Sequence, residues 1–184
     1  MKLPAMFLFA VTATAGALDF RPMVMEGVGE GGKYSYLQFH DHEKAVTYMP
    51  PRSWAFHGRD TQLCLVVPKS TGTEIDISVF AVKKPMPVET ANLHAFEELA
   101  RQSLPAEASK VELVAVDFNP LVIDGHKTIE VIFDYVIFAG PIKVSYLYTA
   151  REAEVLCFRV VSRPEDFDPL RQTFKMSLHS FAGL

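Results

Sequence analysis

Apolar and polar residues alternate over several stretches of this chain, and the alternation sets the strongest constraint on its fold. In the clearest stretch, residues 73–79, Ile75, Ile77 and Val79 share one face of a strand while the other face is polar. Such a strand is typical of an antiparallel sheet with one face on a core and the other in water. Five further stretches are rich in Val, Ile, Phe, Tyr and Thr: 62–67, 111–118, 127–138, 142–149 and 154–161. The last three predict a meander, and a separate turn is predicted at Asp124-Gly125.

Two other stretches have helical periodicity. The apolar stripe of the first consists of Leu93, Phe96, Leu99 and Ala100, and that of the second of Leu170, Phe174, Leu178 and Phe181. We expect Thr90 to cap the first helix and Pro105 to end it. In the second, Asp168 is the expected cap and Pro169 the first helical residue. Together these elements predict an α+β domain, an antiparallel sheet with helices packed on its faces.

The N-terminal residues have the pattern of a signal peptide. Lys2 supplies one positive charge before a short apolar stretch, and residues 15–17 are small, as a cleavage site requires. We therefore predict a signal peptide over 1–17, cleavage near Ala17, and export to the periplasm or out of the cell. No stretch reaches the ~18 apolar residues of a membrane span, and no cysteine follows the cleavage site as a lipid acceptor. Stable membrane insertion is not expected.

Glycine is dense just after the predicted cleavage site. Residues 26–32 include four glycines and no periodic apolar pattern. We interpret 18–33 as a flexible lead-in and 34–184 as one domain. A phosphate-binding glycine loop would need a buried strand before it and a helix after it, and neither is predicted here.

The charge balance restricts the class of partner. The chain of 184 residues has 18 Lys and Arg against 22 Asp and Glu, a formal net charge of −4. Its length suits a single domain, and its acidic balance leaves no large basic surface for nucleic acid. Nucleic acid is therefore not an expected partner.

A short histidine cluster is the one candidate metal site. His40 and His42 are two residues apart, so both imidazoles share a face of an extended strand, and His57 is a third candidate ligand. The same residues lie between two strand-like stretches, 36–39 and 45–48, where a polar hairpin turn is expected. Because the spacing matches no specific metal motif, we favour the turn and expect no metal or other cofactor.

Motifs for covalent or acid–base catalysis are missing from the sequence. There is no Gly-x-Ser-x-Gly elbow, and neither cysteine has a histidine close in sequence. Neighbouring carboxylates such as Glu97-Glu98 and Glu165-Asp166 fall on predicted helices, where they complement the helix dipole without a catalytic role. We expect a protein that is not an enzyme.

Two further groups of residues each allow two interpretations. Cys64 and Cys157 lie in predicted strands and could form a disulfide after export, although two separate thiols are the favoured interpretation. The stretch around Trp54 could be an exposed recognition loop or, as we favour, could place Trp54 in the core. The candidate loop residues are Pro50, Pro51, Arg52 and Trp54.

Several short motifs follow one another in a recognisable order. They are Tyr48-x-Pro50-x-x-x-Trp54, Ile75-Asp76-Ile77-Ser78-Val79, Leu93-x-x-Phe96-x-x-Leu99, Ile123-Asp124-Gly125-x-x-Thr128 and Phe174-x-x-x-Leu178-x-Ser180-Phe181. In this order they resemble the Mog1/PsbP-like α/β/α sandwich superfamily, over about residues 34–181. The resemblance implies a second helical layer and binding rather than catalysis. Members of the superfamily bind a nuclear GTPase, attach to the lumenal side of photosystem II, or are exported bacterial proteins of unassigned role.

The expected function is that of an exported, non-catalytic protein-binding or scaffold domain. Its partner is expected to be another exported or envelope protein. Two alternatives stay open: a metal-binding protein that uses His40 and His42, and a carrier of a small apolar ligand held between sheet and helices.

Overall fold

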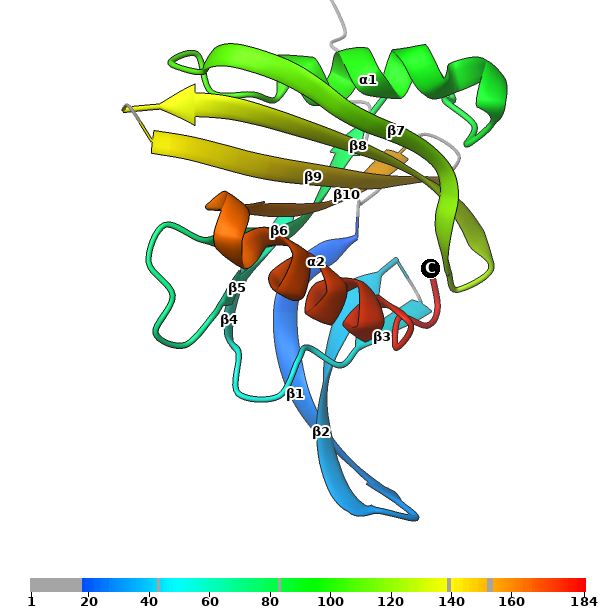
Figure 1. Ribbon diagram of the computed structural model, residues 1–184. Helices are drawn as coiled ribbons and strands as arrows, with labels where there is room; N and C mark the ends of the chain where they lie inside the picture. Colours follow the sequence, from blue (N-terminus) through cyan, green and yellow to red (C-terminus); the bar gives the residue numbers. More distant parts are fainter. Residues whose placement is uncertain (1–17, 43, 83, 139, 152–153) are drawn as a thin grey trace, which may run out of the picture.

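A seven-stranded antiparallel sheet forms the middle layer of the structure (Figure 1). The computed structural model describes residues 18–42, 44–82, 84–138, 140–151 and 154–184. The strands are β4 (Ala55–Arg59), β5 (Gln62–Val66), β6 (Glu74–Ala81), β7 (Ser109–Ile123), β8 (His126–Ile137), β9 (Gly140–Arg151) and β10 (Glu154–Ser162), in the spatial order β4-β5-β6-β10-β9-β8-β7. All six predicted strands are therefore confirmed, and the predicted meander is β8-β9-β10.

The turn predicted between β7 and β8 is also confirmed. Ile123 pairs with His126, so Asp124 and Gly125 form a two-residue connection. Both have positive φ angles, 47° and 82°. This conformation belongs to the hairpin turns that match the twist of the strands, and glycine adopts it without a steric penalty.

A second, smaller sheet lies beside the first and has the order β1-β2-β3. Its strands are β1 (Asp19–Gly29), β2 (Gly32–Asp41) and β3 (Lys44–Tyr48). The start of β1 lies along the edge of the large sheet, where the Phe20 amide donates to the Asp60 carbonyl at 3.1 Å. At the other side, Thr47 of β3 and Ala182 exchange two backbone hydrogen bonds of 2.9 and 3.1 Å. The small sheet is thus tied to both ends of the described chain.

The prediction of a flexible lead-in over 18–33 is wrong. Leu18 and Phe20 are fully buried, and residues 19–29 form a strand that pairs with β2. Gly29 pairs with Gly32 around a short turn, so the glycines belong to a β-hairpin. Glycine density is compatible with both a linker and a hairpin, and the apolar residues on either side decide between them. The predicted signal peptide, residues 1–17, lies outside the described residues.

Two α-helices cover the large sheet, and both begin at other residues than predicted. Helix α1 (Leu93–Gln102) follows a 3₁₀ turn, Thr90–Asn92, and Thr90 makes no side-chain cap. Helix α2 (Pro164–Leu178) begins at Pro164, so Asp168 is not its cap and Pro169 lies inside it. The earlier start buries Phe167 in the core, and proline suits the first helical position because no hydrogen bond is lost there.

The helices lie on opposite faces of the large sheet, which separates two hydrophobic cores (Figure 1). Phe96 and Ala100 of α1 pack on one face, against Val131, Tyr146 and Cys157. The opposite face is covered by α2 together with the three-stranded sheet. This core includes Phe20, Phe39, Tyr48, Leu147, Phe158, Phe167, Phe174 and Phe181. The predicted α+β class, with helices on both faces, is confirmed.

A buried ionic network fixes α2 against the sheet. Glu130 of β8 is fully buried and accepts two hydrogen bonds of 2.6 Å from Arg171 and one of 2.9 Å from Lys175. The Ser145 hydroxyl donates to the same carboxylate at 2.7 Å. Burial acts to raise the pKa of Glu130, but the hydrogen bonds from Arg171 and Ser145 outweigh burial and hold it below its ordinary value.

The polar face of β6 is less exposed to water than the alternation of its apolar and polar residues predicted. Asp76 is buried, and the Arg159 guanidinium on β10 donates to it at 2.7 Å. Arg159 also bonds the exposed Glu74 at 3.0 Å. Pairing with Arg159 lets a charged residue lie under the helical layer that contains α1. None of the helices in the described part of the chain is long and apolar enough to cross a membrane.

Candidate functional site

The β1–β2 hairpin extends beyond the three-stranded sheet as a two-stranded arm (Figure 1). Strand β3 pairs with β2 only from Leu37 to Asp41, so no third strand among the described residues pairs with residues 23–36 of the hairpin. We call residues 23–36 the arm. Its exposed large apolar side chains are Met23, Val24, Met25, Val28 and Tyr34. In the described part of the chain the arm therefore presents apolar side chains at the surface.

The pairing of β1 with β2 sorts the arm residues onto two faces. Met25 pairs with Tyr36 and Gly27 with Tyr34, so these four residues share one face, here called the tyrosine face. Val28 projects from the opposite face and is 80% exposed. The two faces differ in chemistry, because aromatic rings and thioethers gather on one of them only.

Tyr34 lies across Gly27 on the tyrosine face. A Cβ atom placed on Gly27 would lie 2.5 Å from Cζ of Tyr34, so a side chain there would push the ring away. The inner side of the ring therefore rests on the backbone of β1, while Tyr34 as a whole stays 45% exposed. Its ring centroid lies 6.1 Å from that of Tyr36, with an interplanar angle of 38°. Together the two rings form an aromatic platform beside the core of the domain.

A surface groove of ≈310 Å³ opens beside this platform. It is lined by Gly27, Tyr34, Tyr36, Thr47, Tyr48, Met49 and Ser180. These residues come from the arm, from the end of β3 and from the segment that follows α2. None of them carries a charge.

Hydrogen bonds to the end of α2 hold the inner side of the groove. The Tyr48 and Ser177 hydroxyls lie 2.8 Å apart, and the Ser180 hydroxyl accepts a 2.8 Å bond from the Met49 amide. Tyr48 also stacks on Phe181, with ring centroids 4.7 Å apart. Burial raises the pKa of Tyr48, so its hydroxyl stays neutral. The inner side of the groove is therefore built on packed, hydrogen-bonded residues, and its outer side on the arm.

The candidate histidine site is not assembled among the described residues. His40 is exposed on β2, His42 occupies the turn before β3 with a φ of 55°, and His57 lies on β4. No group of three or more His, Cys, Asp or Glu side chains suited to a metal is found in the described part of the chain. The hairpin turn expected at this place is present; Glu43 lies outside the described residues.

The two cysteines lie on strands that are not neighbours. Cys64 of β5 pairs with Asp76 of β6, and Cys157 of β10 pairs with Ser78 of the same strand. One strand therefore separates them, a spacing of roughly 10 Å, whereas the Cα atoms of a disulfide are about 4.4–6.8 Å apart. Both thiols are free, and burial raises the pKa of Cys157. A disulfide between Cys64 and Cys157 is incompatible with this strand order.

The proline-rich stretch before β4 contributes to the core as well as to the surface. Trp54 is partly buried and packs against the core beneath α2. Its amide donates to the Pro51 carbonyl at 3.2 Å, which closes a tight turn. Pro50 is partly buried and Arg52 is exposed. Trp54 thus packs as a core residue, and of the candidate recognition loop Arg52 is the exposed member.

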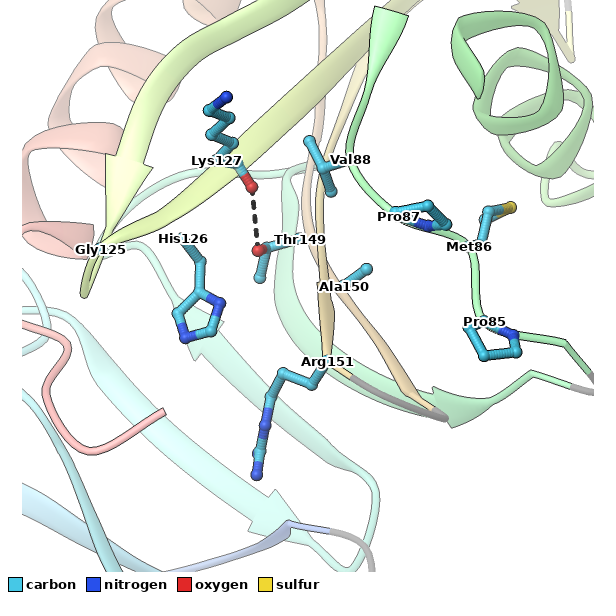
Figure 2. A pocket seen from close by; sticks show the side chains of 10 residues that line it. All are labelled: Pro85, Met86, Pro87, Val88, Gly125, His126, Lys127, Thr149, Ala150 and Arg151. Atoms are coloured by element: carbon cyan, nitrogen blue, oxygen red, sulfur yellow. Dashed lines mark hydrogen bonds between the residues drawn. The ribbon is translucent and has the colours of Figure 1, made fainter. Parts of the chain in front are cut away.

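A second hollow, of ≈410 Å³, lies between residues 85–88 and the ends of β8 and β9 (Figure 2). Its basic side chains have other partners. Arg151 pairs with Asp41, and the Lys127 amine lies over the Phe118 ring, 5.8 Å from its centroid. Figure 2 shows the side chains of Lys127 and Arg151 directed away from each other. This hollow is not the aromatic-lined interior cavity that an apolar ligand carrier would need.

Comparison with known proteins supports the fold and no more than the fold. No family model matches the chain, and no curated protein does. The solution structure of cyanobacterial PsbP (CyanoP) from Synechocystis sp. PCC 6803 aligns with a TM-score of 0.58 and 11% identity, over 86% of this chain and 98% of that chain. The chain has the PsbP-like fold. The resemblance to the Mog1/PsbP-like sandwich is thereby confirmed for the architecture.

A second solved structure shares the PsbP-like fold. It is the Pseudomonas aeruginosa protein PA94, described as a protein of unknown function and a candidate regulator. The TM-score is 0.50 and the identity 13%, over 88% of this chain and 97% of that chain. Identities this low show a common architecture and do not transfer a function to the PsbP-like chain.

The arm is the candidate functional feature that sequence reasoning missed. The signal was present, because two strand-forming stretches flank the short turn at Glu30-Gly31. Because the glycines around this turn were interpreted as a linker, the hairpin was not predicted.

Proposed function

We propose that this protein is an exported, non-catalytic binding domain that engages a partner protein through its arm. The observation that carries the proposal is the exposure of Met, Val and Tyr side chains on a hairpin without a third strand. Exposed apolar patches mark interaction sites, and methionine and tyrosine are favoured in the centres of interfaces. An isolated two-stranded hairpin is only marginally stable in water, so a partner that covers the arm would also stabilise it.

The ionisable groups in the core beneath α2 support binding rather than catalysis. Glu130 is enclosed by Arg171, Lys175 and Ser145, and Tyr48 by the end of α2. Their altered pKa values thus have structural causes in the packing of α2. The groove itself has hydroxyls and rings but no charged group that would transfer a proton at neutral pH.

Export is the remaining part of the proposal, and it rests on residues 1–17. Lys2, the short apolar stretch after it and the small residues at 15–17 form the sequence pattern that supports export. A chain that begins at Leu18 would keep every helix and strand of the described fold.

The test uses the mature chain from Leu18 in quantitative cross-linking with the exported protein fraction of its source. A Tyr34→Ser/Tyr36→Ser variant removes the aromatic platform, and Met176→Ser on the exposed side of α2 is the matched control. We expect one partner to be lost with the arm variant and kept with the control. Equal recovery with both variants would reject the arm as the binding element.

Native mass spectrometry of the same material tests the metal alternative. Stoichiometric zinc or copper that survives dialysis and is absent from a His40→Ala/His42→Ala variant would favour metal binding over the proposed function.

A further inference from the structure

The chemistry of the groove restricts what the partner can place in it. The lining residues carry no charge, so a charged side chain in the groove would lose hydration without gaining a counter-ion. An uncharged segment of the partner therefore matches the uncharged lining of the groove. A volume of ≈310 Å³ is near the lower limit of ligand pockets, about 300–1,000 Å³, and suits a few residues of an extended chain.

The aromatic platform adds a preference for flat or ring-shaped groups. Tyr34 is supported from beneath by the backbone at Gly27, so its outer face can accept a ring without moving. The ring centroid of Tyr36 lies 6.1 Å from that of Tyr34, and the two ring planes are inclined to each other. The two rings therefore form a stepped surface. Grooves lined by aromatic rings are the common receptors of proline-rich segments.

The hydrogen-bonding groups point to the same class of ligand. Tyr34 and Tyr36 each contribute a phenol hydroxyl to the groove, and Tyr34 is exposed. These hydroxyls can donate to peptide carbonyls of a ligand. A polyproline II segment has carbonyls that are free of internal hydrogen bonds, and proline has no amide donor that would need an acceptor in the groove.

We infer that the groove binds an extended, proline-containing segment of the partner in the polyproline II conformation. The inference rests on the proposed function and assigns the chemistry of its partner. Proline rings pack on Tyr34 and Tyr36, and the phenol hydroxyls donate to the carbonyls between them. Because this conformation is largely formed before binding, little ordering entropy is lost.

The test is an NMR titration of the ¹⁵N-labelled chain from Leu18 with a capped ten-residue proline peptide. The reference is a capped peptide of the same length with alanine in place of proline. Both peptides carry the same terminal polar residues for solubility. We expect the proline peptide alone to shift the amide signals of Tyr34, Tyr36, Thr47 and Met49. Equal binding of the two peptides, or shifts confined to other strands, would overturn the inference.

Four variants separate the ring, its hydroxyl and the general stability of the arm. Tyr34→Leu is expected to weaken binding roughly tenfold, as loss of an aromatic anchor does, whereas Tyr34→Phe keeps the ring and most of the affinity. Thr47→Lys introduces a charge into the groove without touching the Tyr34–Gly27 contact, and it should also weaken binding. Glu26→Gln, an exposed polar position on the opposite face of the same arm and not one of its apolar side chains, should leave affinity unchanged. Affinity that is unaffected by Tyr34→Leu and Thr47→Lys would exclude the groove.

Other occupants give distinct outcomes. A second copy of this chain could offer its own exposed Pro85 and Pro87, and self-association that disappears in Pro85→Ala/Pro87→Ala would overturn the inference in favour of a homodimer. Binding of an uncharged hexasaccharide in place of the proline peptide would overturn it in favour of a sugar. Failure of the proline peptide while partner capture still depends on the arm would reject this inference and leave the proposed function standing.

Discussion

Replacing Glu130 by Gln tests whether the buried network is what fixes α2 to the sheet. The substitution keeps the size of the side chain but removes the charge that receives hydrogen bonds from Arg171 and Lys175. Both cations would then lie next to a neutral amide. Their side chains are only 23% and 15% exposed, so water can compensate in part.

The expected loss follows from that burial. Removing one member of a buried ion pair costs about 3–5 kcal/mol, and the partial exposure of both cations favours the lower end. We therefore expect Glu130→Gln to lower the free energy of unfolding by about 3 kcal/mol. For a domain of this size each kcal/mol shifts the Tm by about 2–4 °C, so the Tm should fall by about 6–12 °C.

Urea unfolding followed by circular dichroism, repeated across a range of pH, measures this loss. The pKa of Glu130 lies below its ordinary value of 4.5 in the folded state, so the carboxylate stabilises the fold above about pH 4.5. This contribution is lost as the pH falls through the lowered folded pKa. The curves of wild type and Glu130→Gln should therefore be far apart at pH 7 and converge in acid.

The surface pair of Asp60 with Arg21 provides the control. Their side chains approach to 3.4 Å and are 79% and 69% exposed, so Asp60→Asn is expected to change stability by less than about 1 kcal/mol. A change of less than about 1 kcal/mol for Glu130→Gln as well, or a difference that does not shrink in acid, would refute the reasoning.

Three further outcomes are expected. Protein isolated from an oxidising compartment and then unfolded should titrate with two thiols per chain, because Cys64 and Cys157 cannot meet; a single disulfide mass would contradict the strand order. Gly27→Ala should displace the Tyr34 ring and speed hydrogen exchange of the arm amides, and unchanged exchange would contradict the packing described. Phe138 is 91% exposed with a φ of 48°, so Phe138→Asn should raise the urea midpoint by the equivalent of about 1 kcal/mol, and a lower midpoint would show that the ring has a packing role.

The large sheet could be predicted because the residue pattern of each strand is visible in the sequence of that strand alone. Ile75, Ile77 and Val79 alternate with polar residues, and all three are buried on the face beneath α2. The Asp124-Gly125 turn is similarly local, since two residues that tolerate positive φ connect paired strands. Local chemistry was sufficient wherever neighbours in the sequence are also neighbours in the sheet.

Helix boundaries were harder to predict because tertiary packing decides them. Asp168-Pro169 has the form of a helix start, yet α2 begins at Pro164. Burial of Phe167 supports the extra turn, and its pocket in the core exists only after the sheets have assembled. Pro169 therefore lies inside the helix, where its missing amide removes one backbone hydrogen bond.

The groove could not be predicted, because its residues are brought together only by folding. Met49 and Ser180 are far apart in sequence and joined by two hydrogen bonds, because the Ser180 hydroxyl accepts from the Met49 amide at 2.8 Å and donates to the Met49 carbonyl at 3.2 Å. The position of Gly27 beneath Tyr34 likewise depends on the pairing of β1 with β2. No motif links these residues along the chain.

The backbone pairing of Thr47 with Ala182 has a consequence for the order of folding. A ribosome releases β1, β2 and β3 first, but β3 gains this last pairing only when the final residues of the chain have emerged. Contacts that join the two ends of a chain form late and slowly, because a long loop must close first. The inner side of the groove, which Ser177 and Ser180 hold, is therefore expected to be completed after the other parts of the described fold.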